Sequence, residues 1–244
     1  MGEVTVCSIG TTHPWNVAGV GLDLRIGAEL GARVFTVVCA VSAQDLHGVQ
    51  ALEPVEPGIV QAQLETIPWD AVDAVRVGAL GSPSAVHAVA EALGDLELPA
   101  VVDPVHVATR GGVLSDIPTL REIGAELLTL PTVILTPNLA EASVLLGREI
   151  GREQLAAGAV ELRSRGARAV LLKGGHLEGE PTDAFADAEG VEIWSETRIA
   201  HEMRGTGCTL AMALACALAR GDELRGAARF ARGFVRDKIA KAQP

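Results

Sequence analysis

A glycine-rich hexapeptide, Arg204-Gly205-Thr206-Gly207-Cys208-Thr209, holds the residue types in this chain that are best suited to chemistry. Apolar residues follow it at i, i+3, i+4, i+7 and i+8 from Leu210 to Leu218, which predicts a helix that ends before Gly221. A glycine turn that leads into a helix exposes free backbone N–H groups at the positive end of the helix dipole. Such an arrangement binds anions, so the hexapeptide predicts an anion site.

Two residue types inside the hexapeptide strengthen this interpretation. Gly205 and Gly207 carry no Cβ that would keep a ligand away from the backbone. We expect Cys208 in the first turn of the helix, where the pKa of a thiol is lowered and more of it is thiolate. The structural alternative is a plain turn before a core helix, with Cys208 as a small buried hydrophobe.

Several polar or glycine residues follow predicted strands, where α/β proteins bind their ligands: Gly10, Gln44, Gly78, Asp103, Asn138 and Lys173. Each has a structural alternative, because Asn138 fits a helix cap, Glu141 fits a first helical turn and Lys173 fits a solvated strand end. Together, one lysine, two carboxylates (Asp103 and Glu141) and a glycine-rich helix start favour a polyanion with a divalent cation. Mg²⁺ is typically held by one or two carboxylates with waters and phosphate oxygens, and lysine binds phosphate as a point charge.

Strands and helices alternate along the whole sequence. The patterns predict strands near 4–9, 34–40, 49–55, 74–77, 100–103, 132–136 and 169–172, helices near 17–30, 57–66, 82–93, 138–146, 152–165, 210–218 and 224–242, a hairpin of 184–186 with 191–194, and a polar loop at 42–45. This alternation predicts an α/β fold, with a mostly parallel sheet covered by helices on both faces.

Composition narrows the choice of partner and compartment. The 244 residues carry a formal net charge of −11, which argues against nucleic acid or an anionic membrane as a partner but not against a phosphorylated substrate. The four cysteines show no metal-binding spacing and are typical of reduced thiols in a cytosol. No signal peptide or membrane-spanning run is found. We therefore expect one cytoplasmic domain over residues 1–244.

From Gly10 to Arg229 the chain resembles the hydroxymethylpyrimidine/phosphomethylpyrimidine kinases of thiamine biosynthesis, which are members of the ribokinase-like superfamily. Five segments carry the resemblance in the right order: Ala43-Gln44 with Gly48-Val49, Val102-Asp103-Pro104-Val105 with Val107-Ala108-Thr109, Thr136-Pro137-Asn138-Leu139-Ala140-Glu141, Lys173-Gly174-Gly175-His176 and Gly205-Thr206-Gly207-Cys208-Thr209. The resemblance implies a three-layer sandwich with a mostly parallel central sheet.

The resemblance also implies roles for individual residues. Cys208 would be the general base, and the backbone of Gly205, Thr206 and Gly207 would hold the transferring phosphoryl group. Lys173, Asn138 and Thr206 would bind the nucleotide, and Asp103 and Glu141, with Asn138, would organise Mg²⁺ through waters. The implied substrate side comprises Gly10, His13, Trp15, Asp23, Gln44, Leu80 and Val107. ATP and Mg²⁺, a small-molecule substrate and a homodimer are implied as well.

The first loop departs from the family pattern. Residues 10–21 form a run that is one residue longer than usual and lacks the family's loop aspartate, and His13, Pro14 and Trp15 are bulkier than the serine and glycine of the family. We expect Trp15 or His13 to contact a planar substrate or to close over it. Arg204, Leu80 and His106 also replace the residues most often found at their positions.

Three functions therefore stay open after the sequence alone. The first is a kinase of hydroxymethylpyrimidine or its monophosphate, and the second is a kinase of pyridoxal or another hydroxymethyl heterocycle. The third is a non-catalytic paralogue that binds a ligand, although intact Lys173, Asn138 and Glu141 argue against it.

Overall fold

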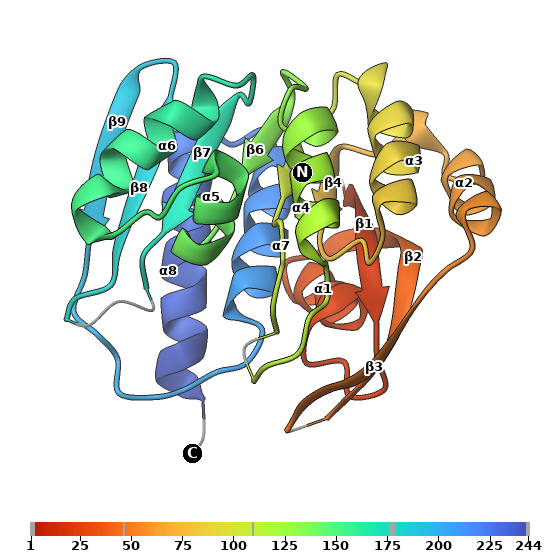
Figure 1. The fold of residues 1–244 in the computed structure, drawn as a ribbon, viewed down its shortest axis with the longest axis horizontal. Coiled ribbons are helices and arrows are strands. Elements are labelled where there is room, and N and C mark those ends of the chain that lie inside the picture. The colour runs from red at the N-terminus through yellow and green to blue at the C-terminus, as the bar shows by residue number, and fades with distance from the viewer. Residues whose placement is uncertain (1–2, 46, 109, 176–178, 243–244) are drawn as a thin grey trace.

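A nine-stranded sheet runs through the computed structural model, which describes residues 3–45, 47–108, 110–175 and 179–242 (Figure 1). The spatial order is β3-β2-β1-β4-β5-β6-β7-β8-β9. The strands are β1 (Val4–Thr12), β2 (Ala32–Asp45), β3 (Gly48–Pro54), β4 (Ala74–Val77), β5 (Ala100–Val102), β6 (Val133–Leu135), β7 (Ala169–Lys173), β8 (Thr182–Asp187) and β9 (Gly190–Ser195). All pairs from β2 to β7 are parallel, and the pairs β2–β3, β7–β8 and β8–β9 are antiparallel.

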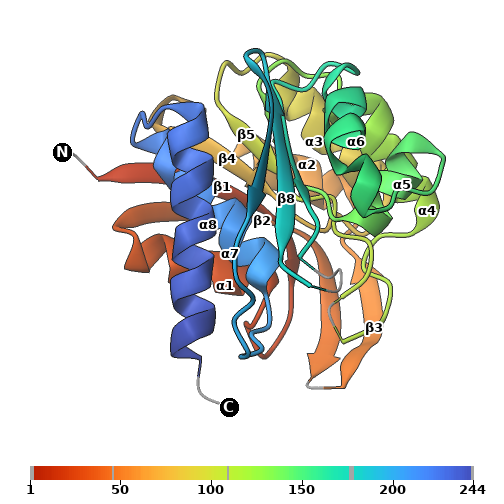
Figure 2. The ribbon, with the colours of Figure 1, turned by 90° about the vertical axis from the view of Figure 1, so that its left-hand side faces the viewer.

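Helices cover both faces of this sheet, as Figure 2 shows from the side. One face carries α1 (Gly19–Glu29), α7 (Thr206–Ala219) and α8 (Leu224–Lys241), and the other carries α2 (Pro57–Glu65), α3 (Pro83–Gly94), α4 (Ile117–Glu122), α5 (Leu139–Leu146) and α6 (Leu155–Arg163). The predicted three-layer α/β architecture is confirmed. Within the described ranges, no helix is long and apolar enough to cross a membrane.

The central strands are apolar on both faces because both faces are packed. In β1, Val6 packs toward α1 and α7, while Cys7 and Ile9 pack into the opposite layer. Such strands give continuous apolar runs in the sequence rather than alternation. Their parallel direction brings the carboxyl ends of β1, β4, β5, β6 and β7 to one edge of the molecule, near the first turn of α7.

One sequence prediction about local structure is wrong, and one α-helix was missed. Residues 42–45 form the end of β2 rather than a loop, because Ser42 and Gln44 pair with β3 in an antiparallel ladder. The helix α4 and the π-helical turn Ile123–Leu127 were not predicted. The helix is only six residues long and begins at an Asp116 cap, whose carboxylate accepts a bond from the backbone of Thr119 (2.9 Å). Tertiary packing, rather than a long periodic pattern, stabilises so short a helix.

Candidate active site

A cavity of about 620 Å³ opens at the carboxyl ends of the parallel strands. Eleven of the predicted site residues line it, namely His13, Gln44, Asp103, Val107, Asn138, Glu141, Lys173, Gly205, Thr206, Gly207 and Cys208. The structure thus brings together in one cavity residues that lie as much as 195 positions apart, from His13 to Cys208. Four predicted residues, Gly10, Trp15, Asp23 and Leu80, are not in its lining.

The glycine-rich turn at the start of α7 forms one wall of the cavity. Gly205 has a φ of +71° and precedes the helix, and a Cβ at this position would lie 2.3 Å from the carbonyl oxygen of Val17. A glycine is therefore required by both the backbone conformation and the space. At Gly207, a Cβ would lie 3.4 Å from both Asp103 Oδ2 and Lys173 Nζ. The helix N-terminus consequently faces these two charged side chains, and this geometry is compatible with the anion site that the sequence predicts.

Lys173 and Asp103 form a buried ion pair opposite this turn. The Lys173 ammonium donates to Asp103 Oδ1 at 2.7 Å, and the Asp103 side chain is only 2% exposed. Thr136 donates a second hydrogen bond to the same oxygen, at 3.3 Å. Burial opposes the charge of Lys173, but the carboxylates of Asp103 and Glu141 outweigh it and hold the pKa of the ammonium above its ordinary value. Lys173 is therefore a cation at neutral pH, as binding of phosphate requires.

Asn138 and Glu141 cap α5 and line the cavity at the same time. The Asn138 side chain accepts from the backbone of Glu141 (2.9 Å), and Glu141 accepts in return from the backbone of Asn138 (2.8 Å). The structural and functional interpretations of these residues are thus compatible. Burial raises the pKa of Glu141 to about 7, and Lys173 opposes this shift. Its carboxyl group therefore gains or loses its proton close to neutral pH.

The donor set suits a magnesium ion that also binds phosphate. Two carboxylates, Asp103 and Glu141, lie close enough to the Lys173 ammonium to raise its pKa. Among the described residues, no group of three or more His, Cys, Asp or Glu side chains could hold a metal alone. Mg²⁺ usually takes only one or two carboxylates and completes its shell with waters and phosphate oxygens. The residues present therefore fit Mg²⁺ bound together with a nucleotide.

Cys208 lies in the first turn of α7, as predicted, but the predicted direction of its pKa shift is wrong. Burial raises the pKa of this thiol, Arg76 opposes the rise, and the carboxylates of Asp23 and Asp103 add to it. The local effect of the helix N-terminus is outweighed because the surrounding protein removes water from the sulfur. The free protein therefore holds Cys208 as a thiol at neutral pH.

Arg76 is a site residue that the sequence did not reveal. It lies in the centre of β4, lines the cavity and is 1% exposed. Its Nη1 atom is 3.1 Å from Asp23 Oδ2, and its Nη2 atom is 3.7 Å from Asp103 Oδ2. In the sequence it sits within an apolar strand, and one signal was available: a charged residue in a strand that is buried on both faces needs a partner.

The cavity lining also contains Gln44, Val107 and His13, three of the residues that the resemblance places on the substrate side. His13 is 4% exposed, and its Nε2 atom accepts a hydrogen bond from the backbone of Ala18 at 3.2 Å. Burial lowers the pKa of His13, with a smaller contribution from Arg204. The imidazole is therefore neutral, and because Nε2 accepts a bond, its proton is on Nδ1.

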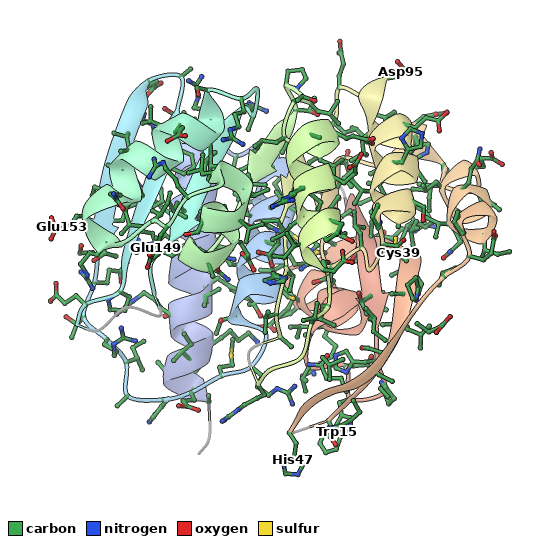
Figure 3. The ribbon with its side chains drawn as sticks, viewed as in Figure 1. Trp15, Cys39, His47, Asp95, Glu149 and Glu153 are labelled. Atoms are coloured by element: carbon green, nitrogen blue, oxygen red, sulfur yellow. The ribbon has the colours of Figure 1, made fainter. Side chains whose placement is uncertain are left out.

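Trp15 does not lie over the cavity, contrary to the sequence prediction. Its side chain is 50% exposed and lies at the outer edge of the molecule (Figure 3). The physical reason is a turn from His13 to Asn16, closed by a 3.3 Å hydrogen bond between their backbones. Asn16 has a positive φ of 50°, and this turn directs His13 inward and Trp15 toward solvent.

The remaining predicted residues have structural surroundings of their own. Asp23 is fully buried behind Arg76 and accepts a 2.7 Å bond from Ser8, Leu80 belongs to the hydrophobic core, and Gly10 packs beside Gly78. His106 donates from Nδ1 to the carbonyl of Ser115 (2.6 Å) and does not line the cavity. Arg204 lines it and donates to the carbonyl of Asp45 (2.8 Å). Thr109 and His176 lie outside the described residues.

Known proteins resemble this chain over nearly all of its length. The family model described as phosphomethylpyrimidine kinase matches residues 14–244. A hydroxymethylpyrimidine/phosphomethylpyrimidine kinase of Rhizobium meliloti is 39% identical over 240 residues, covering 96% of this chain and 90% of that protein.

Solved structures agree with these sequence comparisons. A phosphomethylpyrimidine kinase of Clostridium difficile superposes with a TM-score of 0.84 at 26% identity, covering 97% of this chain and all of that one. A pyridoxal kinase of Staphylococcus aureus in complex with AMP-PCP and pyridoxal superposes with a TM-score of 0.88 at 25% identity, covering 100% of this chain and 90% of that one. The predicted ribokinase-like fold is confirmed.

Proposed function

The chain belongs to the phosphomethylpyrimidine kinase family and is a phosphotransferase of thiamine biosynthesis, and we propose that it uses ATP and Mg²⁺ to phosphorylate hydroxymethylpyrimidine, its monophosphate, or both. The proposal includes one kinase domain over all 244 residues. It also includes the homodimer, the cytoplasmic location and the absence of nucleic acid that the sequence led us to expect.

One observation carries the proposal. The Lys173–Asp103 ion pair, the glycine turn at the N-terminus of α7 and the Cys208 thiol meet in a single cavity. Phosphoryl transfer depends mainly on positioned donors and cations and needs little covalent chemistry from the protein. A non-catalytic paralogue would have no chemical need for this combination.

Each of these groups has a role in the proposed reaction. Lys173 binds the phosphates of the nucleotide, and the backbone N–H groups of residues 205–207 donate to the phosphoryl group as it is transferred. The Sγ atom of Cys208 accepts the proton of the attacking hydroxyl, which requires that Cys208 first become a thiolate. Bound Mg²⁺, held by Asp103 and Glu141, would neutralise charge on the phosphate oxygens.

A second candidate is phosphorylation of pyridoxal. The solved pyridoxal kinase of Staphylococcus aureus matches this chain over its full length. Moreover, the first loop places His13, rather than the aspartate of the family, in the cavity wall. Both substrates are planar heterocycles with a hydroxymethyl group, so the same phosphate-binding groups would serve either one.

A substrate panel tests both candidates. The purified protein is incubated with γ-labelled ATP and Mg²⁺ and with hydroxymethylpyrimidine, its monophosphate or pyridoxal, and label transfer is followed. We expect kcat/KM to be highest for one of the two pyrimidines. A higher value for pyridoxal would favour the second candidate, and no transfer to any acceptor would contradict the kinase proposal.

A further inference from the structure

Polar side chains form a continuous row beneath the first turn of α7. Ser8 and Arg76 pair directly across β1 and β4. Asp103, Thr136 and Lys173 each lie two residues after an apolar side chain that packs toward α7, so they share its face of the sheet. Asp23 reaches this row from α1.

Within this row four charges alternate in sign: Asp23, Arg76, Asp103 and Lys173, here called the charge row. Successive members are 3.1, 3.7 and 2.7 Å apart. All four side chains are buried or nearly so, with 0%, 1%, 2% and 17% exposure. Two positive and two negative charges cancel, so the charge row is neutral before any ligand binds.

Arg76 lies at the centre of the charge row, and its guanidinium lies beside two carboxylates and the Cys208 thiol. These neighbours hold the pKa of the guanidinium above its ordinary value although burial opposes its charge. The backbone reserves space for this group, because a Cβ at Gly78 would lie 2.0 Å from Nη1. An uncompensated charge is very costly in such surroundings, so the ionic state of each member depends on the others.

Lys173 is the member of the charge row most accessible to a ligand, with 17% of its side chain exposed. Its ammonium has three N–H donors, one of which goes to Asp103, so phosphate and Asp103 compete for the same cation. Arg76 then remains as the counter-ion of both Asp103 and Asp23. The guanidinium therefore determines how strongly Asp103 retains Lys173. It also determines the net charge of the charge row, which is called the floor of the cavity below.

We propose that Arg76 is a positioning residue that sets the charge of the cavity floor, releasing Lys173 for phosphate and limiting the affinity of the floor for a divalent cation. This inference rests on the proposed function. It concerns the protein without the heterocyclic acceptor and does not depend on which heterocycle is phosphorylated.

Opposite effects on anion and cation binding follow from this role. In Arg76→Met the floor becomes more negative, so metal-free ATP binds more weakly and Mg²⁺ binds more tightly. In Asp23→Asn the floor becomes more positive, so both shifts reverse. General structural damage would instead weaken both ligands together.

Two calorimetric titrations test the proposal without measuring turnover. ATP is titrated into protein in the presence of a chelator, and Mg²⁺ is titrated into ATP-saturated protein. For Arg76→Met we expect the dissociation constant of metal-free ATP to rise, and that of Mg²⁺ to fall, by about tenfold each. Asp23→Asn should shift both in the opposite direction, and Arg76→Lys should stay within about threefold of the unaltered protein because it keeps the charge.

The double variant Arg76→Met/Asp23→Asn guards against misfolding, because it removes one charge of each sign. It should bring both constants back toward those of the unaltered protein. The inference is overturned if the two single variants shift the constants in the same direction, or if Arg76→Lys is as altered as Arg76→Met. Absence of ATP binding by the unaltered protein would instead contradict the proposed function itself.

Discussion

The two ends of the cavity differ in how firmly their side chains are held. At the proposed phosphate end, Lys173 and Asp103 are paired at 2.7 Å, and Glu141 accepts a hydrogen bond from the backbone of Asn138 at 2.8 Å. At the proposed substrate end, Val107 is 45% exposed, and the Nδ1 atom of His13 is buried with no hydrogen-bond partner among the described residues. A transferring phosphoryl group requires the same preorganised charges whatever the acceptor, whereas loops commonly adapt a fold to a substrate.

The largest effect is expected when the phosphate end loses its cation. In Lys173→Met, kcat/KM for ATP should fall by about 10²–10³-fold, because one preorganised charged donor is lost and Asp103 loses one of its two cationic partners. Lys238→Met is a matched control, since Lys238 pairs with Glu29 on the surface, outside the cavity. Steady-state kinetics at saturating acceptor measure kcat/KM for ATP in both variants. Equal losses in the two variants would show that Lys173 does not act in the site.

Removal of the proposed base should have the next largest effect. Cys208→Ala should lower kcat by about 10²-fold or more, with little change in ATP affinity. The raised pKa of Cys208 also predicts that kcat of the unaltered protein keeps increasing with pH through the alkaline range, since the thiolate fraction grows until the pH reaches that raised pKa. This increase should be absent in Cys208→Ala.

Cys216→Ala is the control for that prediction, because Cys216 is fully buried in the same helix and does not line the cavity. It should keep both the turnover and the pH profile of the unaltered protein. If Cys208→Ala behaves in the same way, Cys208 is a packing residue, which is the structural alternative that the sequence left open.

The outcome at Cys208 illustrates what the sequence could and could not predict. Its place in the first turn of α7 depends on local spacing and was predicted correctly. The direction of its pKa shift depends on burial and on Asp23, Arg76 and Asp103, whose approach is a tertiary effect. For the same reason Asn138 and Glu141, three residues apart on one helix, were recognisable, whereas the partners of Arg76 were not.

The fold shows the same division between local and tertiary information. The apolar β-branched run of β2 and the alternation of strands with helices were sufficient to predict the layers. The extension of β2 through Ser42 and Gln44 was not predicted, because pairing with β3, rather than residue type, makes these polar residues a strand.

A pH titration of metal binding tests whether Glu141 belongs to the metal site. Its pKa of about 7 means that the carboxyl group is mostly protonated at pH 6 and mostly ionised at pH 8. Mg²⁺ competes with that proton, so its apparent affinity should increase by about tenfold from pH 6 to pH 8. Calorimetry of Mg²⁺ binding to ATP-saturated protein measures this change.

Glu141→Gln supplies the reference for this titration, because the nucleotide's own protonation affects both proteins equally. The variant should bind Mg²⁺ more weakly and show a smaller pH dependence. An identical pH dependence in both proteins would mean that Mg²⁺ does not displace a proton from Glu141.

The smallest effects are expected in the first loop, where the inward His13 can be compared with the outward Trp15 two residues away. His13→Ala should raise KM for the acceptor by about three- to tenfold, because a wall residue with a buried N–H donor is lost. Trp15→Leu should change it by less than about twofold, since the indole is half exposed and outside the cavity lining. The kinetics are measured with hydroxymethylpyrimidine and with pyridoxal at saturating ATP, where kcat should stay nearly constant because the phosphate end is unchanged. A rise in KM for Trp15→Leu as large as that for His13→Ala would show that the loop turns over and closes on the substrate.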